Sequence, residues 1–128
     1  MKVAVRYYSR NGHCKKIADI IAEVLSVEAI NIEIENRLKE NVDILFLGGS
    51  PYLGQMDGRL RDYAYNLKGV KKVVLFSVST FSKRAILKLK EIIENKGIEV
   101  DNNYLLIKKS EKDYEEKTRD FARIFLKN

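Results

Sequence analysis

The feature that most constrains this chain is an alternation of short apolar runs with apolar stripes at helical spacing. Segments 3–8, 43–49 and 72–77 have strand character, and the last two are almost continuously apolar, which is typical of parallel strands covered on both faces. Segment 29–34 alternates apolar and polar residues, as a half-exposed strand does. A split or bent last strand is predicted over 98–100 and 104–107.

Between these runs, apolar residues recur every three to four positions and predict helices. The predicted apolar faces are Ile17, Ile20, Ile21, Val24 and Leu25 within 13–26; Leu60, Tyr63, Ala64 and Leu67 within 57–67; Ile86, Leu89, Ile92 and Ile93, ended by Gly97; and Tyr114, Phe121, Ala122 and Phe125. Residues 110–113 resemble a capping box that opens the last helix, and segment 35–42 is too short for a full helix. Strands that alternate with helices predict one α/β domain over residues 1–128, a three-layer sandwich around a five-stranded parallel sheet.

Composition excludes several classes of protein. One Cys excludes a disulfide framework and a Cys-cluster zinc site, and one His excludes a His-rich metal site. No apolar run reaches the ~20 residues of a membrane span and no signal peptide is evident, so we expect a cytoplasmic protein without membrane insertion. The net charge of +6 allows an anionic ligand or partner, but the dispersed lysines form no nucleic-acid-binding arm.

The candidate site lies in the loops that follow the first, third and fourth predicted strands. In an open parallel sheet, ligands bind at the carboxyl ends of the strands, where the strand order reverses. These loops are 9–14, 50–57 and 77–82, and each is rich in Ser, Gly, Asn or Thr. Such residues supply exposed backbone N–H groups and small hydroxyl donors.

The first of these loops carries an unusual charge pattern. Arg10, Lys15 and Lys16 surround a predicted helix N-terminus, and the first acid of the helix is Asp19. The helix dipole disfavours cations at this end by up to about 1 kcal/mol each. A bound phosphate would remove the conflict. The alternative interpretation, solvated surface charges on an ordinary turn, stays open on charge placement alone.

The sequence Tyr8-Ser9-Arg10-Asn11-Gly12-His13-Cys14-Lys15-Lys16 resembles the phosphate loop of flavodoxin-like proteins. The stretch 49–63, which begins Gly-Ser-Pro-Tyr-Leu-Gly-Gln-Met, is similar to the second loop of that superfamily, nearest to the FMN quinone reductases that are similar to the tryptophan-repressor-binding protein. The resemblance implies a flavodoxin-like sandwich with strand order 2-1-3-4-5 and a noncovalent FMN cofactor. The chain departs from that pattern in having no Trp, in Cys14 where Thr is common, and in its basic charge.

The same resemblance implies roles for individual residues. The FMN phosphate would be cradled by Ser9, Arg10, Asn11, Gly12, His13 and Cys14. The isoalloxazine ring would be wrapped by Ser50, Pro51, Tyr52, Leu53, Gly54, Gln55 and Met56, and covered on its other side by Ser77, Ser79, Thr80 and Phe81. No catalytic side chain and no metal ligand is expected.

The implied function is electron transfer to redox partner proteins or small electron acceptors. The alternatives are a small NAD(P)H-dependent FMN quinone reductase and a flavodoxin-fold binding protein without redox activity. Cys14, at a helix N-terminus beside His13 and Lys15, has the setting that lowers a thiol pKa. A phosphatase loop would need Arg near position 20, where isoleucines stand instead. The glycines at 49 and 54 have Walker-loop spacing but lack the Lys-Ser/Thr that follows it, which argues against a nucleotide triphosphatase.

Overall fold

Five parallel strands form the central sheet of the computed structural model, which describes residues 1–52, 54–78 and 83–126. The strands are β1 (Val3–Tyr8), β2 (Ala29–Asn31), β3 (Val42–Gly49), β6 (Val70–Val78) and β7 (Glu99–Ile107), and β4 (Pro51–Tyr52) pairs with β5 (Gln55–Met56) in a separate antiparallel hairpin. The large sheet runs in the order β2-β1-β3-β6-β7. Counted within that sheet, this is the predicted order 2-1-3-4-5, which is confirmed.

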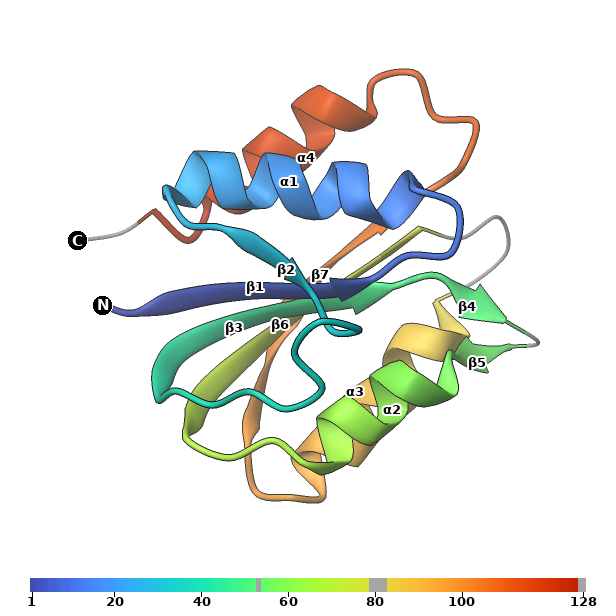
Figure 1. The fold of residues 1–128 in the computed structure, drawn as a ribbon. Coiled ribbons are helices and arrows are strands. Elements are labelled where there is room, and N and C mark those ends of the chain that lie inside the picture. Colours follow the sequence, from blue (N-terminus) through green and yellow to red (C-terminus); the bar gives the residue numbers. More distant parts are fainter. Residues whose placement is uncertain (53, 79–82, 127–128) are drawn as a thin grey trace.

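The helices of the described residues cover both faces of the sheet (Figure 1). On one face, α1 (His13–Leu25) and α4 (Tyr114–Arg123) lie side by side, and on the other lie α2 (Gly58–Tyr65) and α3 (Arg84–Glu94). The predicted three-layer sandwich is therefore confirmed. Strand order reverses between β1 and β3, so the loops that follow these two strands meet at the carboxyl edge. Within the described ranges, no helix combines the length and the apolar character that a bilayer crossing requires.

Each face of the sheet has its own apolar core because successive side chains of a strand point to opposite sides. On β3, Leu45 and Leu47 pack with α2 and α3, whereas Phe46 packs with α1 and α4. All three side chains are fully buried. This double burial is the physical reason for the continuous apolar run in the sequence of β3.

The two glycines that end β3 make room for neighbouring side chains. A Cβ on Gly48 would overlap the ring of Phe76, its partner on β6. A Cβ on Gly49 would lie 2.9 Å from Cδ2 of Leu60 on α2. The glycines therefore let β6 and α2 approach the end of β3, where the second loop begins.

The second strand is shorter than predicted. It was expected over 29–34 but ends at Asn31, whose Oδ1 accepts a hydrogen bond from the N–H of Glu33 at 2.9 Å. The N–H of Ile34 donates to the carbonyl of Asn31 at 3.0 Å, which closes a turn. Asn favours such turns because its side chain bonds its own backbone two residues on. Segment 32–41 then crosses to β3 without a helix, as its length predicted.

The buried face of α1 differs from the prediction. It is formed by Cys14, Ile17, Ala18, Ile21 and Ala22, whereas Ile20, Val24 and Leu25 are only partly buried. The prediction followed the large apolar residues, but the small side chains of Cys14 and the two alanines let the helix approach the sheet closely. By contrast, the predicted face of α2, with Leu60, Tyr63, Ala64 and the following Leu67, is confirmed.

The chain around the last helix brings a further correction. The predicted capping box over 110–113 does not form: α4 begins at Tyr114, and its N-cap Asp113 makes no side-chain capping bond. Glu111 instead accepts from the N–H of Lys108 at 3.1 Å and pairs with Lys117 at 3.1 Å. The predicted split or bent last strand is one strand, β7, whose pairing with β6 shifts register between Val73 and Leu75.

Candidate functional site

The first loop turns from the end of β1 into α1 in four residues. Gly12 occupies the N-cap with φ 87°, a left-handed conformation that glycine adopts without strain. The hydroxyl of Ser9 accepts from the N–H of Gly12 at 3.0 Å, and Oδ1 of Asn11 accepts from the N–H of His13 at 3.2 Å. The side chains predicted to hold a phosphate thus hold the loop in its turn.

The N-terminus of α1 is open and flanked by positive charge. Its N-cap Gly12 has no side chain to cap it, Asn11 accepts from the N–H of His13 alone, and its first turn contains no acid. Lys15 pairs with Asp19 at 2.8 Å, one turn along the helix. The unpaired N–H groups of a first helical turn and the helix dipole together make such an end an anion site.

Cys14 has no reactive thiol. Its side chain is fully buried in the core between α1 and the sheet, and burial raises the pKa of its thiol above the usual value. The expectation that this setting lowers the thiol pKa is therefore wrong, because the Cys14 side chain points away from the charges at the same helix end. Any contact of Cys14 with an anion at this end would come from its backbone N–H.

The second loop is a short hairpin between β3 and α2. Pro51 pairs with Met56 and Tyr52 with Gln55, a hairpin that periodicity did not predict because each strand has only two residues. Tyr52 is 56% exposed, whereas Met56 belongs to the core. Gly54 turns the hairpin with φ 81°. At its start, the hydroxyl of Ser50 is buried without a hydrogen-bond partner among the described residues.

Arg10 joins the two loops. Its Nε and Nη2 both donate to Oδ2 of Asp57, with the Nε bond at 3.2 Å. Its guanidinium also lies over the ring of Tyr52, 4.6 Å from the centroid. Asp57 in turn caps α2 by accepting from the N–H of Arg59 at 2.9 Å. Burial raises the pKa of Asp57, but these hydrogen bonds and the charge of Arg10 outweigh it and hold the pKa below its usual value.

A second arginine, Arg59, was missed by the sequence analysis. Its Nη1 donates to the hydroxyl of Tyr8, and its guanidinium lies 5.1 Å from the centre of that ring. Arg59 lies in the first turn of α2 and Tyr8 ends β1, so this contact also connects the two loops. No local sequence pattern pairs Tyr8 with Arg59, because the two residues are 51 positions apart.

Of the third loop, the structure places Ser77. Its side chain is buried, and its hydroxyl donates to the carbonyl of Gly49 at 2.8 Å, which ties β6 to the end of β3. In this structure Ser77 therefore holds the end of β3, from which the second loop begins. The predicted site residues Leu53, Ser79, Thr80 and Phe81 lie outside the described residues.

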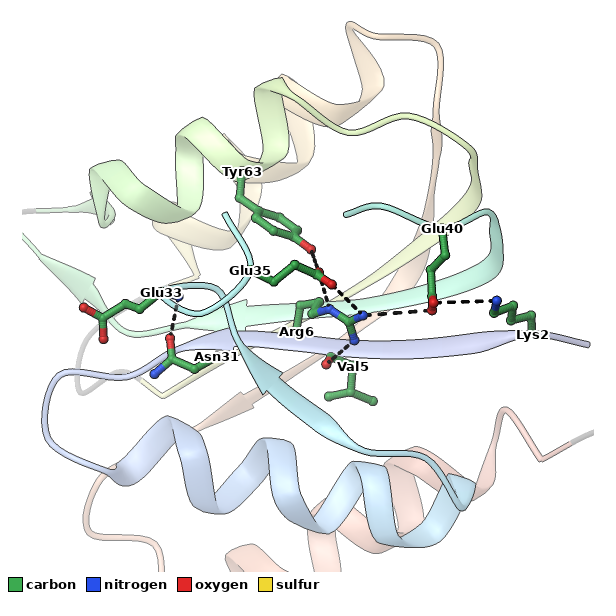
Figure 2. Close-up of polar contacts among 8 residues, drawn as sticks. All are labelled: Lys2, Val5, Arg6, Asn31, Glu33, Glu35, Glu40 and Tyr63. Carbon is green, nitrogen blue, oxygen red and sulfur yellow. Dashed lines mark hydrogen bonds and ion pairs between the residues drawn. The ribbon is translucent and has the colours of Figure 1, made fainter. Parts of the chain in front are cut away.

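A buried ionic cluster lies beside the site on the face of β1 that segment 32–41 covers (Figure 2). Nε of Arg6 donates to Glu35 at 2.7 Å, and the Tyr63 hydroxyl donates to the same carboxylate at 2.8 Å. Nη1 of Arg6 donates to the carbonyl of Val5 at 3.1 Å. Burial raises the pKa of Glu35. The hydrogen bonds from Arg6 and Tyr63 lower this pKa by a larger amount, so the net pKa lies below its usual value. The sequence feature that could have indicated this cluster is Arg6, a charged residue within an apolar strand.

Comparisons with known proteins support the fold. Neither a scan against protein-family models nor a search of curated proteins finds a match to this sequence. Among solved structures, Flavodoxin 2 from Bacillus cereus has a TM-score of 0.77 at 22% identity, over 98% of this chain and 97% of that one. A Fusobacterium nucleatum flavodoxin, solved bound to flavin mononucleotide, has a TM-score of 0.73 at 16% identity, over 97% and 96%.

A larger protein contains the same fold as a part. Rubredoxin oxygen:oxidoreductase from Desulfovibrio gigas has a TM-score of 0.77 at 13% identity, over 95% of this chain but only 34% of its own. The chain thus spans about a third of that protein. At these identities the comparisons establish a flavodoxin-like fold, which confirms the predicted fold class.

Proposed function

We propose that this chain, whose fold is flavodoxin-like, binds one FMN noncovalently at the carboxyl edge of its sheet and transfers electrons. The observation that carries the proposal is the first loop, where a left-handed glycine leads into an open helix N-terminus flanked by cations. Gly12 has φ 87°, and apart from Gly12 and its two neighbours in the chain no described residue lies within 4 Å of where its Cβ would be. Free N–H groups at such a helix end bind phosphate, which FMN carries.

The phosphate end would be held by the first turn of α1. The N–H groups of His13 and Cys14 stand at this end, next to the Ser9 hydroxyl and the Asn11 amide. A phosphate oxygen is a stronger acceptor than the neutral oxygens that now accept from Gly12 and His13. The side chains of Ser9 and Asn11 are thus able to turn from the backbone to the ligand, and Arg10 adds positive charge.

The ring end would lie against the second loop. The Ser50 hydroxyl, which lacks a partner among the described residues, is the kind of group that a polar ring edge would satisfy. The exposed ring of Tyr52 supplies a stacking surface. Gly54, with φ 81°, lets the backbone turn without a Cβ. These residues fit the group, and Leu53, Ser79, Thr80 and Phe81 remain predicted members of the site.

Bound FMN would supply one- and two-electron transfer, which is the chemistry of the cofactor. The residues of the chain would hold the ring, orient it and exclude water from it. Asp57, which pairs with Arg10 and caps α2, would hold the first and second loops together beside the ring. Redox partner proteins or small electron acceptors complete the proposal, and the net charge of +6 favours acidic partner surfaces.

The test is a flavin titration of the full chain with a matched glycine pair. Gly12→Ala and Gly97→Ala each place a Cβ at a left-handed position with open space around it, but Gly97 follows α3, far along the chain from the first loop. We expect Gly12→Ala to weaken FMN binding about tenfold, equivalent to about 1.4 kcal/mol, and riboflavin binding much less. Gly97→Ala should leave both affinities unchanged. Fluorescence quenching on titration measures all of these.

The outcomes separate the proposal from its alternatives. If the purified protein shows no flavin absorbance and does not quench added FMN, the proposal fails and a binding protein without redox activity replaces it. If the FMN-loaded protein oxidises NAD(P)H with a quinone acceptor, it is a reductase and the carrier role is wrong. Equal losses of FMN and riboflavin in Gly12→Ala would show that the first loop does not hold the phosphate.

A further inference from the structure

A cavity of about 140 Å³ lies at the carboxyl edge of the sheet, apart from the second loop. Its lining comes from the first turns of α1, the ends of β6 and β7, and the segment that leads into α4. The residues concerned are His13, Lys16, Ile17, Val78, Ile107, Lys108, Lys109, Glu111 and Tyr114. None of them belongs to residues 50–57, but His13 is a predicted phosphate residue and Val78 follows Ser77, so this cavity borders the predicted flavin site on the side away from the second loop.

The floor of the cavity is apolar. Ile17, Val78 and Ile107 are almost fully buried and belong to the core between α1, α4 and the sheet, and the partly buried Tyr114 packs against that core. An engineered cavity of similar size, about 150 Å³, binds benzene in another protein. The cavity therefore has the volume, and its floor the apolar lining, to accept one six-membered ring.

The rim of the cavity is cationic. Lys16, Lys108 and Lys109 are exposed there, and the imidazole of His13 adds polar N–H capacity. Glu111 is the one carboxylate among the described lining residues. It already accepts from the N–H of Lys108 at 3.1 Å and pairs with Lys117 at 3.1 Å. The three lysines consequently face the opening with an excess of positive charge.

We infer that this cavity binds a small aromatic carboxylate, with its ring on the apolar floor and its anionic group at the lysines. An inorganic anion would use only the rim, and a neutral ring would use only the floor. A single ring that carries one carboxylate uses both, because the floor and the rim share one opening. Apart from His13, the side chains that it uses are not among those predicted to hold the flavin.

Benzoate is the probe for this inference, titrated into the full chain with and without saturating FMN. Backbone amide shifts in NMR should change saturably at Ile17, Val78 and Ile107. Benzamide, the neutral analogue, should bind at least about tenfold more weakly. The double variant Lys108→Gln/Lys109→Gln should weaken benzoate about tenfold. The control Lys68→Gln/Lys88→Gln removes the same charge from exposed positions that do not line the cavity and should leave the affinity unchanged.

Three results would overturn the inference. Equal binding of benzoate and benzamide would remove the role of the lysines. Unchanged benzoate affinity in Ile107→Phe, a variant that fills the floor, would show that the ring lies elsewhere. Complete competition between benzoate and FMN would place the probe in the flavin site. The FMN titration without benzoate reports on the proposed function separately, so failure of one proposal is distinguishable from failure of the other.

Discussion

Two arginine–carboxylate pairs hold loops of this protein in place, and they differ in which partner is buried. In the pair of Arg6 and Glu35, the arginine side chain is 4% exposed and the carboxylate, 18% exposed, reaches it from segment 32–41. In the pair of Arg10 and Asp57, the carboxylate is 7% exposed and the arginine, 47% exposed, reaches it from the first loop. Both are ion pairs between an arginine and a carboxylate, but the more exposed partner is Glu35 in the first pair and Arg10 in the second.

The difference explains what each pair is suited to do. A buried guanidinium needs its counter-charge, and removing one partner of a buried pair costs about 3–5 kcal/mol. Arg6 therefore holds segment 32–41 over the sheet, and this segment is too short to form a helix. An arginine that is 47% exposed regains water when it leaves its partner, and the buried Asp57 then still accepts from the N–H of Arg59. Arg10 can thus move when a ligand enters between the two loops.

The largest expected effect is on the buried pair. Glu35→Ala should lower the free energy of unfolding by about 3 kcal/mol, because the buried Arg6 loses its hydrogen-bonded counter-charge and the Tyr63 hydroxyl loses its acceptor. Glu40, whose carboxylate lies 3.9 Å from Nη2 of Arg6 and is 42% exposed, remains as a weaker counter-charge without a hydrogen bond to Arg6. Denaturant unfolding measures the change.

Two further variants sharpen this test. Glu33→Ala changes an exposed carboxylate of the same segment, whose side chain points away from Arg6 in Figure 2, and should shift stability by less than about 0.5 kcal/mol. Adding Arg6→Met to Glu35→Ala should restore most of the loss, because no buried charge remains. If the double variant is as unstable as Glu35→Ala, the cluster acts through packing and the comparison of charges is wrong.

Acid pH should remove part of the same contribution. The pKa of Glu35 is lower in the folded protein than its usual 4.5, so the unfolded state binds more protons as pH falls. The stability that Glu35 contributes is fully present above pH 4.5 and is lost as pH falls through the lowered folded pKa. The stability difference between the natural chain and Glu35→Ala should therefore shrink below that pH. A difference independent of pH would contradict an ionised Glu35.

A smaller effect is expected at the exposed pair, where Asp57 also caps α2. Asp57→Ala should cost about 1–2 kcal/mol, because the N–H of Arg59 loses its acceptor. Asp57→Asn should cost less than about 0.5 kcal/mol, because the amide oxygen still caps the helix although the ion pair is gone. Thermal unfolding of the two variants compares the cap with the pair. Equal losses would mean that the ion pair matters more than its exposure indicates.

The smallest effect on stability is expected for Arg10→Gln. It should change the free energy of unfolding less than Glu35→Ala does, because Asp57 still accepts from the N–H of Arg59. The ratio of FMN to riboflavin affinity should nevertheless fall about threefold, since a charge next to the phosphate is lost. Parallel flavin titrations at low salt measure the ratio. An unchanged ratio would indicate that Arg10 stays on Asp57 when flavin binds.

The apolar pattern of the sequence was sufficient for the strands and for the position of the loops, whereas the strand order came from the resemblance to flavodoxin-like proteins. Apolar periodicity is a local property, so β1, β3 and β6 were recognised from the runs that double burial requires. Apolar periodicity failed as a predictor where local hydrogen bonds or small side chains decided the structure. Asn31 ended β2 with a turn that its apolar neighbours did not reveal, and the buried face of α1 included small residues that a search for large apolar side chains passed over.

The candidate site divides in the same way. The first and second loops, and the open N-terminus of α1, followed from the sequence by itself, because strand order and helix polarity determine where loops meet and where free N–H groups gather. Only the tertiary structure decided that Arg10 pairs with Asp57, 47 residues away, and Arg6 with Glu35, 29 residues away. A local pattern carries no information on such pairs, because they depend on strand register and on which surfaces the packed helices bring together.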